Sequence, residues 1–316
     1  MCDFFPVSAE EIASWDGKSA DFLLKLDRHG IFPAPEDDAE SFRARVYKGF
    51  AYMEKNAASI SAGETKIILW QSQSGNDKLE VNSRDIIDTG HFVPAWELTD
   101  NLYSFAVDYV PGFYLFEKVG LLWGGCSIYD DETEMKVFLL RPAFRKRKRF
   151  LIYSRTELIA HELCHCARQP MHDHDIEEYF AYQTSRSLLR RYIGNCFNKE
   201  TDALLFLLPS ILLLIAQFIK SFLAASLPLW PFWGFLAAVL AYFFIRNQYS
   251  RNIISKARKK LSSVCKKPEA VLFRSSLTEL KILGKSFEKY IESLSPMRRE
   301  IMKFHCDGYD SGTVQQ

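Results

Sequence analysis

The chain has 316 residues, enough for one core of ordinary size with accessory segments, or about two domains. It carries 40 basic and 39 acidic residues, and this near balance argues against general nucleic-acid binding. The seven cysteines follow no regular spacing, which is typical of reduced thiols in a cytosolic compartment and not of a disulfide framework. The first residues have neither a basic nor an apolar region of the kind found in signal peptides, so we expect no cleavable leader.

Residues 1–64 are predicted to form a helical region. The prolines near residue 34 end one helix, and the acidic residues after them begin the next. Apolar residues then recur at helical spacing, at Phe42, Val46, Phe50 and Met53.

The segment that follows changes to short runs rich in β-branched and aromatic residues. These runs predict strands at 66–70, 103–110, 112–116, 126–129 and 136–140. The acidic segment 130–134 between the last two predicts a hairpin turn. A dense basic run, 145–149, comes next and suits either a cytoplasmic lipid surface or a solvated turn.

Two helices are predicted after the basic run. Ser154-Arg-Thr-Glu157 has the pattern of a capping box, which predicts a helix over 154–168. Pro170 ends it, because proline disfavours helical conformation in the residue before it. Asp175 is a candidate N-cap for a second helix that runs to about residue 195.

Two apolar stretches, 203–219 and 227–245, contain no charged residue. A membrane span needs about 20 mostly apolar residues, so the pair predicts a transmembrane helical hairpin over 203–245. Trp230 and Trp233 lie at one end, as interfacial aromatic residues do. Basic residues flank the outer ends of both stretches, and only Lys220 lies between them. Both the N-terminal part and a basic tail of three short helices, 246–316, are therefore expected in the cytosol.

The segment His161-Glu162-Leu-Cys-His165 carries the chemistry. Its two histidines lie one helical turn apart on one face, where zinc accepts two imidazole nitrogens and keeps room for a third ligand and water. Glu162 lies beside them and is the candidate general base, able to take a proton from the attacking water and pass it to a leaving amine.

Residues 154–190 resemble the gluzincin branch of the zincin metallopeptidases. Members supply the third zinc ligand from a glutamate on the next helix, and Glu178-Tyr-Phe-Ala181 is similar in register. The resemblance thus implies Glu178 as third ligand, with Glu177 as the alternative. Glu178 also suits a second capping box, Asp175-Ile-Glu-Glu178, and one carboxylate cannot be both cap and ligand. Gly124-Gly-Cys126 offers a further assignment, since peptide deformylases use such a cysteine as third ligand.

The resemblance also implies how substrate would lie. In zincins a strand pair before the metal helix includes an edge strand that aligns an extended substrate, and the runs 126–129 and 136–140 occupy that place. Substrate would pair there by strand addition. His172, His174 and Tyr182 are candidates for stabilising the charge that develops in the transition state, or else ordinary loop and core residues.

Together these patterns predict an α+β fold with a zincin-like catalytic domain at 65–200, a transmembrane hairpin and a helical tail. The expected function is zinc-dependent hydrolysis of a peptide bond, with a peptide or protein substrate and a lipid bilayer as partners and no nucleic acid. The alternative is a membrane-tethered interaction or regulatory protein that keeps a zincin scaffold without catalysis.

Overall fold

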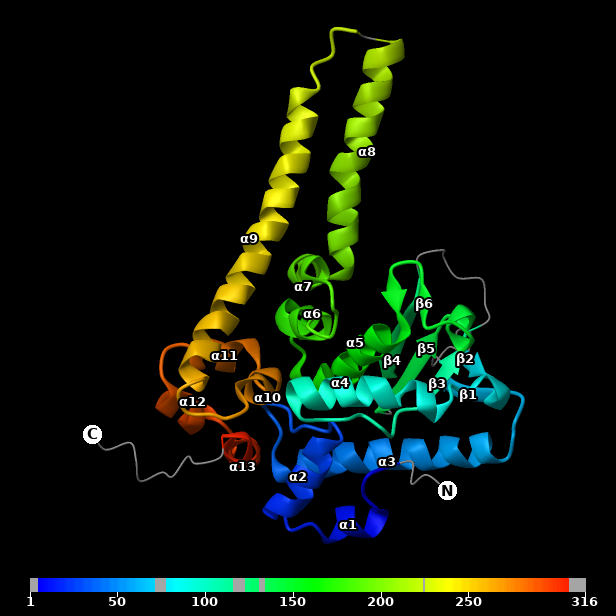
Figure 1. Ribbon diagram of the computed structural model, residues 1–316, viewed down its shortest axis with the longest axis vertical. Coiled ribbons are helices and arrows are strands. Elements are labelled where there is room, and N and C mark those ends of the chain that lie inside the picture. Colours follow the sequence, from blue (N-terminus) through cyan, green and yellow to red (C-terminus); the bar gives the residue numbers. More distant parts are fainter. Residues whose placement is uncertain (1–4, 72–77, 116–122, 131–133, 224, 307–316) are drawn as a thin grey trace.

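The protein is described by a computed structural model that covers residues 5–71, 78–115, 123–130, 134–223 and 225–306. Helices dominate and three small sheets accompany them, so the fold is α+β as predicted. A helical hairpin projects from one end of a wider body that holds all the sheets (Figure 1).

The N-terminal region is helical, as its sequence predicts. It forms α1 (Ala9–Ser14), α2 (Ala20–Arg28) and α3 (Ala39–Ser61). Asp38 caps α3, its side chain accepting a hydrogen bond from the backbone N–H of Ser41 at 2.8 Å. The apolar positions read from the sequence face the core: Phe42, Val46 and Met53 are buried and Phe50 packs against them.

Most of the predicted strands are present. An antiparallel pair, β1 (Ile67–Gln71) and β2 (Lys78–Val81), precedes a three-stranded sheet in the order β3-β5-β4. The members of that sheet are β3 (Gly112–Tyr114), β4 (Gly125–Asp130) and β5 (Met135–Leu140). The register pairs Asp130 with Met135, so β4 and β5 form the expected antiparallel hairpin. Part of the predicted turn, 131–133, lies outside the described residues.

The predicted strand at 103–110 is wrong. Two short 3-10 turns, η1 (Ser83–Asp85) and η2 (Thr89–His91), lead instead into α4 (Val93–Tyr103), and an irregular segment then runs to β3. Phe105, Val107 and Tyr109 gave this segment the alternating pattern of a strand. Each of them is buried by tertiary packing of an irregular segment. A run of alternating apolar residues does not by itself separate a buried loop from a strand.

A small hairpin joins the sheet to the helix that carries His161 and His165. The turn η3 (Pro142–Arg145) is followed by β6 (Arg149–Phe150) and β7 (Tyr153–Ser154), and then α5 (Arg155–Arg168) begins where the sequence predicts. The predicted capping box is wrong, because Ser154 pairs in β7 and makes no side-chain cap. Glu157 instead accepts a hydrogen bond from Ser185 at 3.1 Å.

The second predicted helix is shorter than expected. After η4 (Gln169–Met171) the chain forms α6 (His174–Tyr182), breaks, and continues as α7 (Leu188–Ile193) and η5 (Gly194–Cys196). Its N-cap is Asp173, without a side-chain cap, so the role predicted for Asp175 is wrong. Hydroxyl residues cause the break: Thr184 donates to the carbonyl of Ala181 at 2.7 Å, and Ser187 caps α7. Such side chains compete with helical hydrogen bonds.

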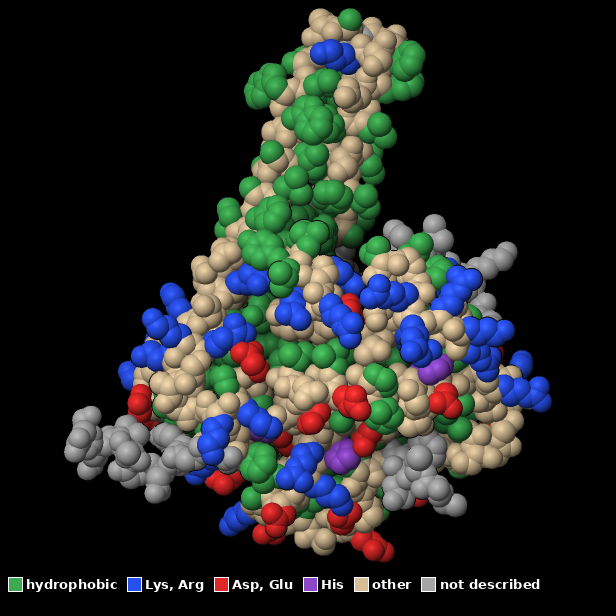
Figure 2. All heavy atoms as spheres, in the orientation of Figure 1, with side chains coloured by type: hydrophobic (Ala, Val, Ile, Leu, Met, Phe, Trp, Pro, Cys, Tyr) green, Lys and Arg blue, Asp and Glu red, His purple; other side chains and the backbone are tan. Residues whose placement is uncertain are grey.

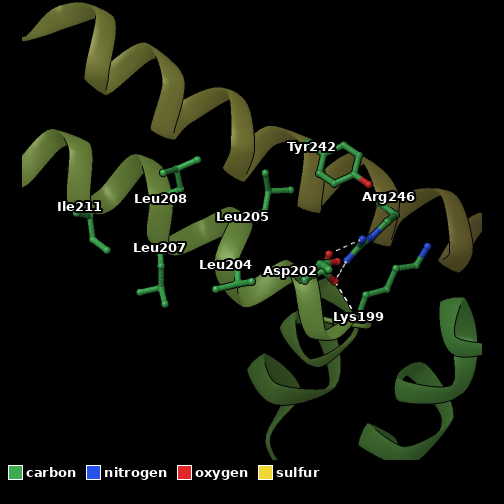
Figure 3. Close-up of a pocket in the computed structure, with 10 residues that line it drawn as sticks. Lys199, Asp202, Leu204, Leu205, Leu207, Leu208, Ile211, Tyr242 and Arg246 are labelled. Atoms are coloured by element: carbon green, nitrogen blue, oxygen red, sulfur yellow. Dashed lines mark hydrogen bonds and ion pairs between the residues drawn. The ribbon is translucent and has the colours of Figure 1, made fainter.

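The apolar stretches form the hairpin, α8 (Glu200–Phe222) and α9 (Trp230–Leu261), which pack against each other. Within the described residues, one helix, Thr201–Phe222, is long and apolar enough to cross a membrane. Apolar side chains cover the hairpin and basic ones gather where it meets the body (Figure 2). At the base, in a groove of about 660 Å³, Arg246 of α9 pairs with Asp202 of α8 at 2.5 Å (Figure 3).

The C-terminal part contains four short helices where we predicted three. They are α10 (Pro268–Phe273), α11 (Leu277–Leu283), α12 (Phe287–Ser293) and α13 (Pro296–His305). They share one apolar core with the N-terminal helices and with α5 and α6. Buried Arg274, which follows α10, connects the C-terminal helices to the N-terminal ones, because its guanidinium forms an ion pair with Asp27 of α2 at 2.6 Å.

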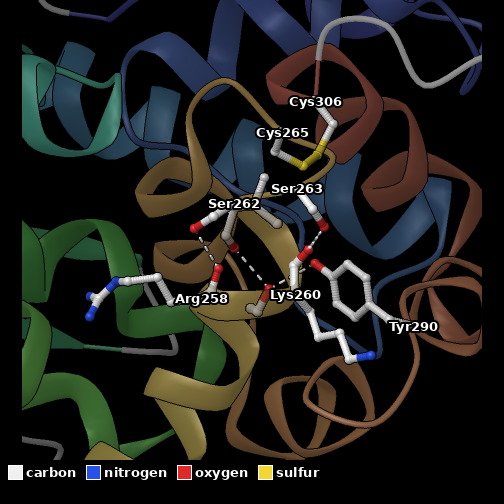
Figure 4. Close-up of a disulfide and its surroundings, with 9 residues drawn as sticks. Arg258, Lys260, Ser262, Ser263, Cys265, Tyr290 and Cys306 are labelled. Carbon is white, nitrogen blue, oxygen red and sulfur yellow. Dashed lines mark hydrogen bonds between the residues drawn. A yellow bond between two sulfur atoms is a disulfide. The ribbon is translucent and has the colours of Figure 1, made fainter.

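The prediction that all cysteines are reduced thiols is wrong for one pair. Cys265, just beyond α9, forms a disulfide with Cys306, just beyond α13, and both are buried (Figure 4). The two lie 41 positions apart in the sequence, and only the packing of these two helix ends brings them together.

Candidate metal centre

Helix α5, which carries His161 and His165, packs between β4 and α6. Its helical spacing places His161 and His165 on the face toward α6, and their Nε2 atoms lie 3.2 Å apart. Glu178 of α6 completes the group, with Oε2 3.5 Å from Nε2 of His161 and Oε1 3.5 Å from Nε2 of His165. These three side chains form the group of ligand atoms within the described residues that could hold a metal ion.

Glu177 lies on the other side of His165. Its Oε1 is 2.8 Å from Nδ1 of that ring, so Nδ1 is engaged and Nε2 is directed toward His161 and Glu178. Metal-ligating histidines almost always make such a bond from the nitrogen that does not bind the metal, because it fixes the tautomer and the ring orientation. Glu177 therefore suits the support of a ligand better than the ligand role considered for it from the sequence.

The electrostatics of the group also suit a cation. Burial lowers the pKa of His165, but the hydrogen bond with Glu177 and three nearby carboxylates outweigh it and raise that pKa to about 9. Burial raises the pKa of Glu178 to about 7, partly offset by His165. Burial, with the positive charges of His165 and Arg190, keeps the pKa of His161 well below its ordinary value. Partly buried carboxylates are stabilised in their ionised form by a nearby positive charge. A divalent ion bound between the two imidazoles would supply that charge.

Glu162 is held apart from this group. It points from α5 toward β4, where its Oε2 accepts hydrogen bonds from the backbone N–H of Ser127 at 2.9 Å and from the Ser127 hydroxyl at 3.0 Å. Burial raises the pKa of the carboxyl, and the opposite charge of His165 and the two Ser127 bonds partly offset that rise. Glu162 is thus fixed in orientation through one oxygen.

Strand β4 is an edge of its sheet, since among the described strands only β5 pairs with it. The N–H of Ser127 points to Glu162 and away from β5, so the backbone groups of Gly125, two residues earlier, also face the outer edge. This edge runs beside the histidines, as the resemblance to zincins implied.

Two cavities lie along the edge, and His161 and Glu162 line both, while His165 and Glu178 line only the larger. One, of about 230 Å³, is bounded by Gly124 and Gly125, by Tyr153 and by Arg190. The other, of about 320 Å³, reaches from Ser127 and Tyr129 to α6. Because successive residues of β4 and the two residues His161 and Glu162 border them, we call the two cavities together the cleft.

Comparison with known proteins leaves the family open. No family model, curated protein or solved structure matches the chain.

The remaining candidates from the sequence lie around this cleft. His172 and His174 line the 320 Å³ cavity, and Nδ1 of His174 lies 3.6 Å from Glu177. Tyr182 lines the 230 Å³ cavity with its ring edge-on to His161, 4.6 Å between centroids. Burial raises the pKa of Tyr182 to about 12, so its hydroxyl stays protonated and able to donate.

Two alternatives for the third ligand fit less well. Cys126 is not part of the ligand group; it packs against the apolar cluster of Ile67 and Val137, and burial raises its pKa to about 11. The capping role for Glu178 is wrong, because α6 begins at His174 and Asp173, not Asp175, is its N-cap.

Sequence reasoning missed two residues of the site, Ser127 and Arg190. Ser127 holds Glu162 from a strand 35 positions earlier. The Arg190 guanidinium lies 5.4 Å from the ring of Tyr153, at the rim of the smaller cavity. Ser127 lies on a predicted edge strand, and this position could have indicated a role in the site. For Arg190 the sequence shows only that it belongs to the basic residues before the first apolar stretch.

Proposed function

We propose that the protein is a membrane-anchored zinc metallohydrolase that cleaves peptide bonds. The observation that carries the proposal is the convergence of His161, His165 and Glu178 on one point, beside a separately held Glu162 and an edge strand. Two imidazoles and one carboxylate are the ligand set of many catalytic zinc sites, with a further position for water. Zinc in such a set supplies a Lewis acid and lowers the pKa of water.

The chain's own residues divide the remaining work. Glu162 is the general base: Ser127 fixes its Oε2, and Oε1 is left to take a proton from the attacking water and later deliver it to the leaving amine. The Tyr182 hydroxyl donates toward the charge that develops on the carbonyl oxygen, with His172 and His174 as alternatives on the opposite side of the cleft.

Substrate binds as an added strand. The N–H and carbonyl of Gly125 and the carbonyl of Ser127, on the outer edge of β4, would pair with an extended peptide, while the Ser127 N–H stays with Glu162 and the two cavities receive side chains on either side of the scissile bond. In strand addition the protein recognises the backbone of an extended peptide, so this mode of binding suits a peptidase better than a hydrolase of small esters or amides.

We further propose that α8 and α9 both span the membrane, with the body in the cytosol. Basic residues border both helices on the body side, and cytoplasmic flanks are the ones enriched in lysine and arginine. The disulfide argues the other way, because such bonds persist mainly in oxidising compartments. We give more weight to the charges, since Cys265 and Cys306 are 7% and 1% exposed and so shielded from cellular thiols.

Metal analysis of the full-length protein tests the function. We expect one zinc per chain, retained in Glu162→Gln, and cleavage of unstructured peptides by wild type alone. Stoichiometric zinc without cleavage by either protein would favour a catalytically silent scaffold. Absence of zinc that added metal cannot restore would remove the proposal.

A further inference from the structure

Four exposed apolar side chains lie outside the hairpin but on the same end of the body. Leu151 and Ile152 form the turn between β6 and β7, and Leu188 and Leu189 open α7; they are 56%, 70%, 77% and 67% exposed. In Figure 1, α7 lies directly beneath α8, and β6 lies at the same end of the body, to the right of α8. Exposed apolar groups gathered in this way mark an interaction surface.

The backbone conformation of Leu151 in the turn is unfavourable for a leucine, so the fold alone does not explain this residue. It occupies the left-handed region, with φ of 49°, in a two-residue hairpin turn. Glycine, asparagine and aspartate are the residues that favour such positions, and a bulky side chain there is strained. A leucine that strains the backbone and points into solvent is better explained by what it contacts outside the chain.

A lipid bilayer fits this surface. The α7 part of the surface is connected directly to the hairpin, since α7 leads through η5 into α8. The basic run Arg145–Arg149, all five residues exposed, ends two residues before Leu151, and Arg186 lies two residues before Leu188, the first residue of α7. Apolar tips flanked by lysine and arginine are the pattern of segments that lie in the interface of anionic membranes.

The same two elements bound the smaller cavity of the cleft. Arg190 links the β6–β7 turn to α7. Its Nη1 donates to the carbonyl of Ile152 at 3.4 Å and lies 3.5 Å from the carboxylate of Glu157 in α5. Tyr153 and Arg190 line the cavity, and each is adjacent in sequence to an exposed apolar pair. This side of the cleft is therefore bounded by the two elements that carry the exposed apolar pairs, while the apolar side chains themselves do not line it.

We propose that the 151–152 turn and α7 enter the interface of the membrane that the hairpin spans. The cleft then opens at the bilayer surface and receives polypeptide segments emerging from the membrane. The second half of this inference, the substrate class, rests on the proposed peptidase function, whereas the membrane contact rests only on the proposed membrane anchor.

Spin labels test the contact. Full-length Ile152→Cys and Leu189→Cys would be labelled with a nitroxide and reconstituted in vesicles of equal parts phosphatidylcholine and phosphatidylserine. Tyr47→Cys is the matched control, an aromatic residue 52% exposed on α3, away from the hairpin. We expect relaxation by oxygen, relative to a water-soluble nickel chelate, severalfold higher at 152 and 189 than at 47. Equal ratios, or shielding from both reagents as in a protein contact, would overturn the proposal.

A second variant tests whether the turn's side chains make the contact. Leu151→Gly with Ile152→Ser puts glycine at the one turn position that has a positive φ and a small polar residue at the next, so the fold should be kept or stabilised. In this background the ratio at Leu189→Cys should fall toward that of Tyr47→Cys. An unchanged ratio at 189 with an unchanged thermal midpoint would show that the turn does not reach the lipid.

The substrate class is tested with one cleavable segment presented in two ways, next to a transmembrane helix or as a free peptide. The same double variant should raise KM for the membrane form severalfold and leave the free peptide unaffected. Equal effects on both forms would reject the substrate class alone. If wild type cleaves neither form, the peptidase proposal fails, while the spin-label result still decides the contact.

Discussion

Nδ1 of His165 lies 2.8 Å from Oε1 of Glu177, while Nε2 of the same ring faces Glu178 at 3.5 Å. Adjacent carboxylates on α6 thus engage opposite nitrogens of one imidazole. Glu178→Gln should abolish stoichiometric zinc binding, because an amide is a poor replacement for a carboxylate ligand. Glu177→Gln should weaken zinc binding by about 10–100-fold, the usual cost of losing such a support. Titration with a competing chelator measures both.

Asp175→Asn is the control for these variants. It lies in the first turn of the same helix and is not part of the ligand group. Equal zinc affinity in Glu177→Gln and Glu178→Gln would contradict the division of roles between the two residues.

Glu162→Gln should retain zinc and fold and lose about 10²–10⁴-fold in kcat, the typical contribution of a general base. The amide still accepts the hydrogen bonds from Ser127, so the edge strand stays in place. Ser127→Ala should be milder, because the backbone N–H remains. Peptide cleavage by metal-loaded protein measures both, and a Ser127 variant less active than Glu162→Gln would show that the serine does more than orient the base.

The part of this site that is local in sequence could be predicted, and the part that depends on tertiary packing could not. Helical periodicity alone puts His161 and His165 on one face, and the short spacer brings Glu178 within reach. Ser127 approaches Glu162 only because β4 packs on α5. The hydroxyl residues Thr184, Ser185 and Ser187 are the sequence signal for the helix break after Tyr182. The disulfide between Cys265 and Cys306 was not, since it depends on two distant helix ends meeting.

The buried pair of Asp27 and His305 predicts acid sensitivity. Burial and the charge of Arg274 lower the pKa of His305, although Asp27, 2.9 Å away, opposes this. A lowered pKa means that the folded state binds fewer protons than the unfolded state. Stability is therefore present above the unfolded pKa of about 6.5 and is lost as pH falls below it, by at most about 1.4 kcal/mol per pH unit.

Denaturant unfolding of wild type and His305→Gln isolates this contribution. It is measured at pH values between 7.5 and 5.5, about one unit either side of the ordinary histidine pKa. Glutamine keeps a donor for Asp27 but does not titrate, so the difference in stability between the two proteins should shift in favour of the variant on acidification. A difference that stays constant with pH would contradict a depressed His305 pKa in the folded protein.

The topology prediction concerns the connection between α8 and α9. Charged residues cost about 2.5–3.5 kcal/mol at the centre of a bilayer, so the uncharged cores of the two helices set their depth. With both helices spanning, Ser226 in the connection lies on the side opposite the body. In intact cells an impermeant maleimide should label Ser226→Cys. It should label Ser14→Cys, exposed on α1, only after permeabilisation. Cys265 and Cys306 should react in neither state without a reductant, because the disulfide engages them. Labelling of Ser14→Cys from outside would place the body in the oxidising compartment and make the disulfide, not the flanking charges, the correct guide to orientation.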